Sequence, residues 1–575
     1  MATLTYLLTA LWRKSVNLWR RLRRRRTDWV RMEVSGALPE LTEPLVWWQG
    51  RLGGVASPLS LQILRRRFER LADDPHIRGV VLVIRDLSAG WAAIQGLHEI
   101  LRVYRDAGKR VVAYLPSADT RAYFAACCAD RVVMPPTAYL NLTGLRVEVT
   151  FFGDALRLAG LEAEVIAVSP YKSGGDQLAR ASLSPEAREQ LERLVDDRFT
   201  MLVETIAAAR GLSTDQVRAL IDRAPFRADA AREAGLLDAT CYEDELEAYL
   251  RGLDHPDAAE TTTPAGGDDG LALIDWLQAD RWLPLPPARR ERRFVGVIPV
   301  IGAIATGPSR RSPLPLPIIG GNLAGSDTIA QALRRAERDR RIAAIVMHID
   351  SPGGDSFASD LIWREALRLS RLKPLVVSMG DVAASGGYYI AAPARAIMAR
   401  PATLTGSIGV LAVRVNGAAL LERARIGVGV ISRGANSGLF SPLRPLEANE
   451  RDALTRTVFE TYAIFKDRVR EGRGIEEERL EPIAGGRVWT GREAALFGLV
   501  DDLGGLPAAV ARARELAGLP PDPRPTLLMV RGGGRRDLLP RPFPPAEARS
   551  FLPALLEEAL RTRVLAALPF IFREV

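Results

Sequence analysis

The stretch of the chain best suited to covalent chemistry is a serine followed by two glycines, Ser385-Gly386-Gly387, within the segment 381–389. It follows the apolar run Leu375–Ser378 and opens another apolar stretch, which indicates a strand that turns into a helix. A serine at such a turn has an exposed hydroxyl, and the glycines leave backbone N–H groups free to face a ligand. The segment can hold a nucleophile, although a Gly-rich turn with a capping serine would have the same sequence.

A second Gly-rich turn, Ser351–Asp355 with the sequence SPGGD, follows the strand predicted over Ala344–Ile349. Both turns come after parallel strands, at the ends where open α/β sheets bind their ligands. Glycine turns lying side by side can supply N–H donors with no side chain in the way, as an oxyanion hole requires. We predict that the amides of Gly354 and Gly386 have this role. The alternative is that both turns only maintain the sheet geometry.

A nucleophilic serine needs a general base, and histidine is the usual one. All the histidines precede Ser385 in the chain. His98 falls inside a predicted helix and His348 inside a buried-looking strand, so both are better explained as packing residues. Lysine is then the alternative base, because the guanidinium of arginine stays protonated.

The lysines are few and occupy different settings: they are Lys14, Lys109, Lys172, Lys373 and Lys466. The first lies in a basic N-terminal arm, the last in a charged amphipathic stretch, and two others come just before strands. Lys172 instead follows the apolar run 165–168 and lies in a turn. Burial there would lower the pKa of its amine, which is the condition for accepting a proton from serine near neutral pH. Spacing alone makes Lys172 a candidate without excluding the other lysines.

The elements around these residues occur twice. Strands predicted over Gly79–Ile84, Arg110–Leu115 and Arg131–Met134 alternate with amphipathic helices, and the same rhythm returns in the second half of the chain. Gly79 corresponds to Ala344 and Tyr123 to Tyr388, a constant offset of 344 − 79 = 265. The alternation predicts an α/β fold with parallel sheets. The constant offset predicts an internal duplication.

The two copies differ at the candidate site. The first half has Thr120 where the second half has Ser385, and it lacks the Pro-Gly-Gly turn. Only the second half can therefore assemble a site at these turns. We predict a basic N-terminal arm over 1–30, two duplicated domains over 31–252 and 294–518, a linker over 253–293 with one short helix, and a tail over 519–575 with an amphipathic helix.

The N-terminal arm combines apolar residues at helical spacing with a cluster of arginines between Arg13 and Arg26. The apolar stretch is too short to cross a bilayer, which takes about 20 residues. In a secretory signal the positive charges precede the apolar run, whereas here they follow it. We predict a basic amphipathic helix that lies on an anionic membrane surface. Docking on the protein's own core or on a partner chain is the alternative.

Composition excludes several other classes of function. The net charge of +9 is largely local to the arm, and no aromatic-basic stripe or zinc spacing accompanies it, so we predict no nucleic-acid partner. The cysteines are Cys127, Cys128 and Cys241, an odd number that fits small core residues better than a disulfide framework or a metal site. We predict no metal and no cofactor.

Several motifs together resemble the long, tandem-domain form of the signal peptide peptidase A family, membrane-associated serine proteases with a fold similar to Clp protease and crotonase. The residues that carry the resemblance are Ser351–Gly354, Ser378–Gly380, Ala383–Tyr388, Pro401–Gly409, Trp489–Gly491 and Tyr171–Ser173. The resemblance implies that Ser385 is the nucleophile, that Lys172 is the general base, and that Ser407 orients the lysine amine.

The resemblance also implies a partner class and an assembly. Family members form oligomers whose sites face an internal chamber, so we expect a homotetramer that admits extended peptides such as cleaved signal peptides. The basic arm stands where the bacterial long form has a spanning helix, which implies peripheral association, with a bacterial inner membrane as the expected location. Two alternatives remain: a crotonase-type acyl-CoA enzyme with Asp355 as its base, and a non-catalytic membrane scaffold.

Overall fold

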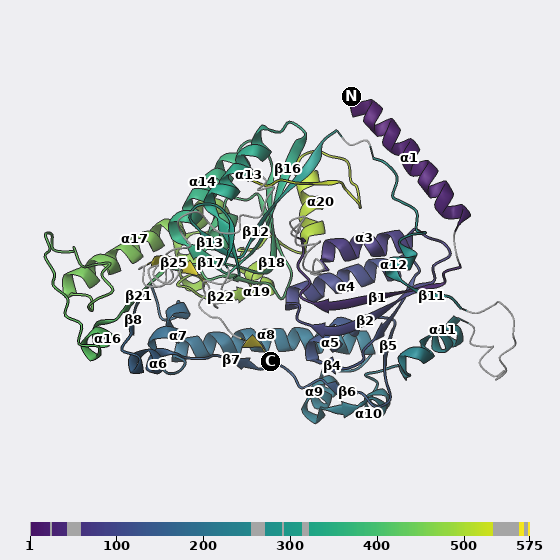
Figure 1. Ribbon diagram of the computed structural model, residues 1–575, viewed down its shortest axis with the longest axis horizontal. Helices are drawn as coiled ribbons and strands as arrows, with labels where there is room; N and C mark the ends of the chain where they lie inside the picture. The colour runs from purple at the N-terminus through teal and green to yellow at the C-terminus, as the bar shows by residue number, and fades with distance from the viewer. Residues whose placement is uncertain are drawn as a thin grey trace. The chain divides into compact units, whose positions relative to one another are not determined.

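The chain is a mixed α/β protein with parallel sheets, as predicted (Figure 1). The computed structural model describes residues 2–23, 26–42, 59–254, 271–289, 292–312, 321–532, 563–567 and 573–574. Contacts between α-carbons divide the chain into two compact units. Unit 1 consists of Met1–Leu145 and Arg198–Glu291, and unit 2 of Arg146–Asp197 and Arg292–Val575.

Unit 1 is built on a six-stranded parallel sheet in the order β10-β5-β3-β2-β1-β11. Its central strand β2 has a continuous apolar run that is buried on both faces, which is typical of a parallel sheet covered by helices. The strands are β1 (Trp29–Gly36), β2 (Gly79–Leu87), β3 (Arg110–Tyr114), β5 (Arg131–Met134), β10 (Ala239–Thr240) and β11 (Leu273–Asp275). The helices of this unit include α3 (Leu61–Ala72), α4 (Trp91–Asp106) and α5 (Thr120–Ala126).

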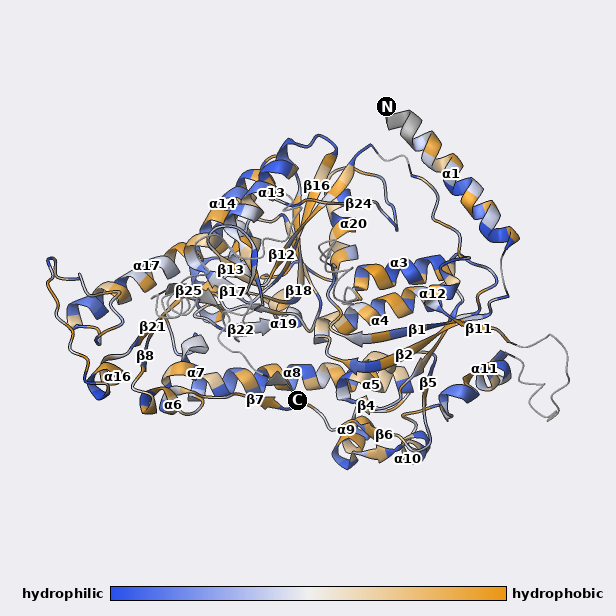
Figure 2. Cartoon of the chain, in the orientation of Figure 1, coloured by the Kyte–Doolittle hydropathy of each residue, from blue (hydrophilic) through white to orange (hydrophobic). Residues whose placement is uncertain are grey.

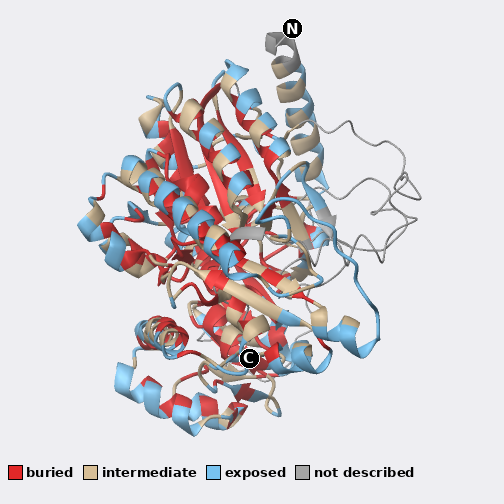
Figure 3. Cartoon of the chain, turned by 90° about the vertical axis from the view of Figure 1, so that its left-hand side faces the viewer, coloured by how far each residue is buried: buried red, intermediate tan, exposed pale blue. Residues whose placement is uncertain are grey.

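Unit 2 repeats this sheet in a larger form, with the path β22-β20-β18-β16-β12-β24 and with β19 and β23 continuing beside β18. Burial is concentrated in its strands and on the inner faces of its helices (Figure 3). The strands are β12 (Phe294–Ile301), β16 (Ile342–Ser351), β18 (Leu375–Ala384), β19 (Ala396–Ala399), β20 (Leu404–Gly406), β22 (Val488–Thr490), β23 (Asp502–Leu503) and β24 (Leu527–Met529). The helices of this layer include α13 (Ser326–Arg338), α14 (Ser356–Ser370), α15 (Gly386–Ala391) and α20 (Leu506–Leu516).

Unit 2 contains a second sheet, which is assembled from segments far apart in the sequence in the order β14-β15-β13-β17-β25-β21-β8. Its members are β8 (Glu162–Ala167), β13 (Ala303–Ala305), β14 (Arg310–Ser312), β15 (Gly321–Gly325), β17 (Gly353–Asp355), β21 (Leu411–Asn416) and β25 (Arg563–Ala567). In this sheet β25, from the C-terminal tail, pairs with β17 of the SPGGD turn, and β8, from the first half of the sequence, lies two strands beyond β25.

The internal duplication is visible in matching hydrogen bonds of the two units. The Tyr123 hydroxyl donates to the Leu236 carbonyl in unit 1, and Tyr388 donates to Leu499 in unit 2. The Lys109 amine bonds the carbonyls of residues 74 and 77, and the Lys373 amine bonds those of residues 339 and 336. Both lysines therefore have the same structural function in loops that precede corresponding strands.

The compact units differ from the predicted domain boundaries. Segment 146–197 belongs to unit 2, although the sequence pattern assigned it to the first domain, because β8 pairs with β21 over six residues. The division between the units falls inside the long helix α8 (Pro185–Arg210). Local sequence patterns could not reveal this exchange, because a strand's pairing partner is decided by tertiary structure.

Two further expectations are corrected in the linker and the tail. The short helix expected near residues 271–277 is the strand β11, which pairs with β1, followed by one turn of helix, α12 (Trp276–Ala279). Part of the tail helix expected over 551–572 lies outside the described residues. The part that is described, β25, is a strand that pairs on both sides. A short apolar run fits the helical and the strand periodicity equally well, so its structure depends on whether a neighbouring strand is available for pairing.

The N-terminal arm forms helix α1 (Ala2–Leu22), on which apolar and basic residues alternate (Figure 2). Its polar side chains Arg13, Asn17 and Arg20 bond backbone groups of the segment 280–287. Many of its large apolar side chains are exposed, namely Leu8, Leu11, Trp12, Leu18, Trp19 and Leu22. None of the described helices combines the length and apolar character that a membrane crossing requires.

We predict that Asp238→Ala lowers the free energy of unfolding of unit 1 by about 3 kcal/mol. Asp238 accepts hydrogen bonds from Arg210 and from the Val132 amide, and its removal leaves a largely buried guanidinium without its anion. Urea denaturation measures the loss. The control is Asp229→Ala, which removes an exposed ion pair with Arg227 and should cost less than about 1 kcal/mol. Equal losses in both variants would contradict this account.

Candidate active site

Ser385 lies at the junction between β18 and α15, where it is the N-cap residue of the helix. Its backbone has φ 54° and ψ −116°, a region that residues other than glycine seldom adopt. The Ser385 amide donates to the Gly406 carbonyl at 2.8 Å, which holds the turn in place. Strained backbone of this kind is concentrated at functional sites. The predicted strand-to-helix turn is thus present, but Ser385 is completely buried, whereas the sequence predicted an exposed hydroxyl.

The Ser-Gly-Gly motif is explained by close packing against the SPGGD turn. A Cβ at position 387 would lie 2.9 Å from the Ser351 carbonyl oxygen, so only glycine fits without a shift. A Cβ at position 354 would lie 2.1 Å from the Ile304 carbonyl oxygen, because β17 passes directly beside β13. The glycines therefore permit the close approach of three backbone segments around Ser385.

Lys172 reaches the same place from the other end of the sequence. It follows β8 and precedes a short 3-10 turn, and its chain is held by the antiparallel pairing of β8 with β21. The neighbouring Ser169 donates to the Gly485 carbonyl, and the Val168 amide donates to the Val410 carbonyl. These contacts fix the backbone on which the lysine stands.

The lysine amine contacts two serines. Nζ lies 2.7 Å from the Ser385 Oγ, 2.9 Å from the Ser407 Oγ and 2.9 Å from the Ser407 carbonyl oxygen. Lys172 is 1% exposed, and both serines are fully buried. The structure thus brings together the three residues Lys172, Ser385 and Ser407, which were singled out from distant parts of the sequence.

Burial lowers the pKa of the Lys172 amine well below its ordinary value. The low-dielectric interior disfavours the ammonium form, and no carboxylate of the described residues forms an ion pair with Lys172 to offset this. The amine is consequently poised to be neutral at a pH where an exposed lysine is charged. A neutral amine can accept a proton.

Ser407 also has a positive φ, 51°, which residues other than glycine seldom adopt. It directly follows β20, and its amide donates to the Arg487 carbonyl at 2.6 Å. The preceding Thr405 hydroxyl donates to the Ala383 carbonyl, which ties β20 to the strand that ends at Ser385. The left-handed backbone turns both the carbonyl and the hydroxyl of Ser407 onto the lysine.

Sequence reasoning missed the turn Gly485–Gly486, which packs on the lysine stem. A Cβ at position 486 would lie 2.6 Å from the Lys172 Cβ and 2.7 Å from its Cα, and the residue has φ 89°. The Gly486 amide donates to the Ile408 carbonyl, next to Ser407. The Gly-Gly pair at 485–486 was a possible signal, but nothing local to it indicates a lysine more than 300 positions away.

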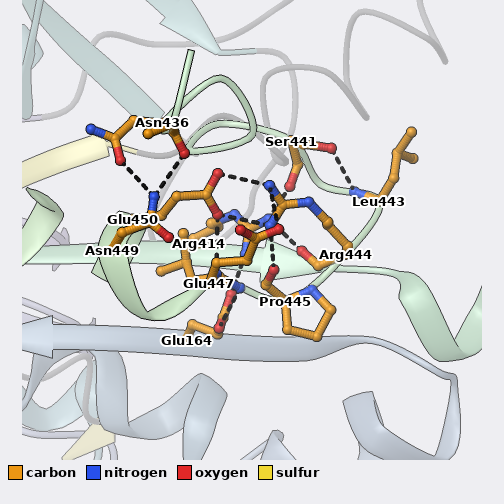
Figure 4. A network of polar contacts seen from close by, with 12 residues as sticks. Glu164, Arg414, Asn436, Ser441, Leu443, Arg444, Pro445, Glu447, Asn449 and Glu450 are labelled. Atoms are coloured by element: carbon orange, nitrogen blue, oxygen red, sulfur yellow. Dashed lines mark hydrogen bonds and ion pairs between the residues drawn. The ribbon is translucent and has the colours of Figure 1, made fainter. Parts of the chain in front are cut away.

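A buried ion-pair network anchors the strand that leads to Lys172 (Figure 4). Arg414 of β21 is 1% exposed, and it pairs with Glu164 of β8 and donates to the carbonyls of Ser441 and Arg444. Arg444 in turn pairs with Glu450, which is fully buried at the start of α17 (Ala448–Arg473). Removing one partner of such a network is costly, so these pairs fix β8 firmly in place.

The other residues considered from the sequence lie in separate settings. Gly386 is the first residue of α15, so its N–H has no acceptor within the helix, and Gly354 lies in β17, which contacts α15. The Asp355 carboxylate accepts from the Ala358 amide and caps α14. The amine of Lys466 pairs with two glutamates. His348 Nδ1 lies 3.4 Å from the Ser378 Oγ inside the sheet.

One group of potential metal ligands occurs among the described residues, outside this site. The ligand atoms of His98, Cys127 and Cys128 lie within 4.8 Å of one another in unit 1. His98 Nε2 and the Cys127 Sγ both bond the Phe124 carbonyl oxygen, and the His98 ring stacks edge-on against the Phe124 ring. Packing of α4 on α5 accounts for this arrangement.

A parallel α/β fold with a serine at a strand-to-helix turn and a buried lysine beside it is the arrangement of a serine hydrolase. The model of peptidase family S49 matches residues 104–254 and 368–520, one match in each duplicated half and together more than half of the chain. The chain belongs to peptidase family S49 and is a serine endopeptidase.

Similar proteins cover most of the chain. It is 34% identical over 480 residues to the chloroplastic serine protease SPPA of Arabidopsis thaliana, covering 82% of this chain and 68% of the relative. Protease 4 of Haemophilus influenzae is 28% identical over 511 residues, covering 84% and 78%. Protease 4 of Salmonella typhi is 31% identical over 461 residues, covering 78% and 70%.

Two solved structures overlap smaller parts of the chain. An enoyl-CoA hydratase/isomerase described as putative, from Acinetobacter baumannii, covers 33% of this chain and 68% of its own, with 18% identity and a TM-score of 0.21. A serine-to-alanine mutant of the 1510-N membrane-bound stomatin-specific protease covers 40% and 87%, with 11% identity and a TM-score of 0.24.

We predict that Gly486→Ala lowers the rate of serine labelling by a fluorophosphonate about 100-fold, because the added methyl displaces the Lys172 stem and small displacements at an active site cost on this order. The control is Gly474→Ala at the end of α17. It has a similar left-handed backbone with open space around it, so it bears the backbone strain alone. Equal labelling rates in the two variants would refute the proposed contact.

Proposed function

We propose that Ser385 is the nucleophile and Lys172 the general base of this endopeptidase. The observation that carries the proposal is the 2.7 Å separation between a fully buried lysine amine and the Ser385 Oγ. The duplicated halves would then divide the work: the sequence of the first half supplies the lysine, and that of the second supplies the serine.

The hydrogen-bond partners around the amine can all be used by a neutral lysine. A neutral amine has two N–H donors and one lone pair. The Ser407 carbonyl and the Ser407 Oγ can accept the two donors, which leaves the lone pair for the Ser385 hydroxyl proton. An ammonium could donate to the same three acceptors, but no carboxylate of the described residues pairs with it, so burial of its charge is unfavourable. Ser407 is therefore proposed as the residue that orients the amine.

The proposed reaction is acyl transfer. The Ser385 Oγ attacks the carbonyl carbon of a peptide bond while its proton moves to Lys172 Nζ. The C–N bond then breaks, the lysine returns the proton to the leaving amine, and an acyl-enzyme ester remains. Water hydrolyses the ester with Lys172 again acting as the base. The amides of Gly354 and Gly386 are proposed to stabilise the oxyanion of each tetrahedral intermediate.

The proposed substrates are extended, unfolded peptides, including cleaved signal peptides, and the proposed assembly is a homotetramer. Support for the peptide class comes from the sheet that contains β17 and β21, because a strand next to the site can hold a peptide by backbone hydrogen bonds. The tetramer follows from the family resemblance of the sequence.

The alternative of a crotonase-type acyl-CoA enzyme is less well supported. Its proposed base, Asp355, already accepts a helix N-terminal N–H and is oriented by that bond. A non-catalytic scaffold would not account for a buried lysine that pairs with no carboxylate of the described residues, since such strongly perturbed groups are concentrated at catalytic sites.

We also propose peripheral association with the surface of a bacterial inner membrane. The apolar side chains of α1 are exposed while its polar side chains bond to segment 280–287, and Lys14, Arg21 and Arg23 add positive charge. An exposed apolar face flanked by basic residues favours an anionic lipid interface.

We predict that Ser385→Ala and Lys172→Arg each abolish peptidase activity with folding unchanged. A fluorophosphonate should label the wild-type chain at Ser385 alone. Because the pKa of Lys172 is lowered and the base must be neutral, kcat/KM should fall as the pH drops below that pKa and level off above it. Full activity of Lys172→Arg would disprove the dyad. Labelling elsewhere would disprove the nucleophile.

We predict that Leu11→Glu combined with Trp12→Glu reduces binding to vesicles containing anionic phospholipid at least tenfold in co-sedimentation, because both side chains are exposed on α1. The matched control is Leu496→Glu, a comparably exposed leucine in unit 2. If the α1 variant and the control bind equally, α1 is not the membrane contact.

A further inference from the structure

Two adjacent cysteines and a histidine lie together in unit 1, where helix α5 ends beside helix α4. Cys127 and Cys128 directly follow the last residue of α5, and His98 belongs to α4. The Sγ atoms of both cysteines and a ring nitrogen of His98 lie within 4.8 Å of one another. Thiolate and imidazole are the ligands that Zn²⁺ prefers in proteins. The proposed reaction uses none of the three residues.

The other copy of the duplication has none of these ligand atoms. At the offset of 363 − 98 = 265, Trp363 corresponds to His98, and Ala392 and Pro393 correspond to the two cysteines. The indole nitrogen of tryptophan is a donor only, and alanine and proline side chains offer no ligand atom. The ligand set is therefore specific to unit 1.

The packing of the helices does not require these residue types. α14 packs on α15 in unit 2 as α4 packs on α5 in unit 1. The ring centroids of His98 and Phe124 are 4.9 Å apart, and those of Trp363 and Tyr389 at the corresponding positions are 6.4 Å apart, with both pairs edge-on. Packing therefore explains where the three side chains of unit 1 lie, while their chemical type needs a further explanation.

The backbone of α5 orients the His98 ring in a way that suits ligation. Its Nε2 lies 2.7 Å from the Phe124 carbonyl oxygen. A carbonyl can only accept, so Nε2 carries the ring proton, and Nδ1 of the neutral imidazole keeps its lone pair. Metal-bound histidines usually donate their other ring N–H to a carbonyl or carboxylate in this manner.

The two cysteines are also held in place. The Cys127 Sγ lies 3.2 Å from the Phe124 carbonyl oxygen, and Arg105 of α4 donates to the Cys128 carbonyl at 3.0 Å. Arg105 also pairs with Asp130 at 2.6 Å, so a carboxylate offsets its charge beside the thiols. Cys127 is buried and Cys128 is half-buried, which gives a cation access from the side of Cys128.

We propose that Cys127, Cys128 and His98 bind one zinc ion, through the two sulfurs and His98 Nδ1, with the fourth position left to water on the side of Cys128. Binding releases the two thiol protons, and two thiolates balance the charge of Zn²⁺. With Zn–S bonds of about 2.3 Å, the sulfurs of a tetrahedral site are roughly 3.8 Å apart, so the ligand atoms have to approach by about 1 Å.

This inference is independent of the proposed function. The sequence predicted no metal, because the spacing of the cysteines does not reveal that a histidine from the preceding helix lies beside them. The ion joins the end of α5 to α4 in the half of the protein that lacks the serine. A ligand that binds only the folded state stabilises that state, so zinc should stabilise unit 1.

The first test uses Co²⁺ as a spectroscopic substitute for zinc in the reduced, chelator-treated full chain. We expect one equivalent to bind with a thiolate-to-cobalt charge-transfer absorption. Cys127→Ala, the residue that unit 2 has at this position, should weaken Co²⁺ binding at least tenfold, as should Cys128→Ser. The matched control is Cys241→Ala, another buried cysteine of unit 1, which should bind like the wild type. No absorption in the wild type, or equal binding by all variants, would overturn the proposal.

The second test concerns the histidine. His98→Phe keeps an aromatic ring against Phe124 and removes the ligand nitrogen. We expect it to weaken Zn²⁺ binding at least tenfold in competition with a chromophoric chelator. The control is His76→Phe, which removes an exposed histidine of the same unit and should leave zinc binding unchanged. Equal zinc affinities of the two variants would show that His98 is not a ligand.

The third test measures stability. Zn²⁺ should raise the urea midpoint of the wild-type chain, whereas Mg²⁺, which prefers oxygen ligands, should not. Cys127→Ala should lose the zinc effect. No zinc effect in the wild type, or the same effect in Cys127→Ala, would overturn the proposal. Labelling of Ser385 by a fluorophosphonate decides the proposed function separately, because none of these measurements depends on catalysis.

Discussion

The structure depends on the burial of one amine. Lys172 is buried with its amine 2.7 Å from the Ser385 hydroxyl oxygen, and no carboxylate in the described part of the chain pairs with it. Burial of an ammonium in such a setting is strongly unfavourable, and the lowered pKa of Lys172 reflects this. The surrounding fold has to supply acceptors for a neutral amine, exclude water and hold the lysine stem, and most of the unusual local features serve one of these needs.

Those features come from separate parts of the sequence. Ser385 and Ser407 both adopt left-handed backbone, which turns a hydroxyl or a carbonyl onto the amine. The Gly486 turn packs on the Lys172 side chain, and the Arg414–Glu164 ion pair anchors β8, the strand that precedes Lys172. Each feature has a local cost, either strain or a buried charge, that the packed sheet around it has to offset.

The sequence was informative where a physical signal is local. Strands such as β2 and β16 are continuous apolar runs. The 265-residue offset indicated a duplication, and the equivalent hydrogen bonds of Tyr123 and Tyr388 occur in both copies. The serine turn could be located by its glycines. Residue patterns alone did not distinguish Lys172 from the other lysines, because a contact between residues 213 positions apart leaves no periodic signal in the sequence. The family resemblance singled it out.

Other elements could not be predicted for the same reason. Segment 146–197 was assigned to the first domain because it follows that domain in the chain, and the pairing of β8 with β21 reverses the assignment. The sequence of β25 was interpreted as helical, but its short run of apolar and small residues fits the helical and the strand periodicity equally well. It forms a strand because it pairs with β17 on one side and β21 on the other. Gly486 has a function only through a neighbour that is remote in sequence.

The dispersal of the site along the chain also has a consequence for how the protein is made. The lysine, the serine and the Gly486 turn leave the ribosome in that order, and 486 − 172 = 314 residues separate the first from the last. At about 5–20 residues per second this takes roughly 16–63 s. Throughout that interval the nascent polypeptide has an unpaired lysine or an unsupported serine. The proposed dyad therefore cannot be completed before residue 486 has left the ribosome.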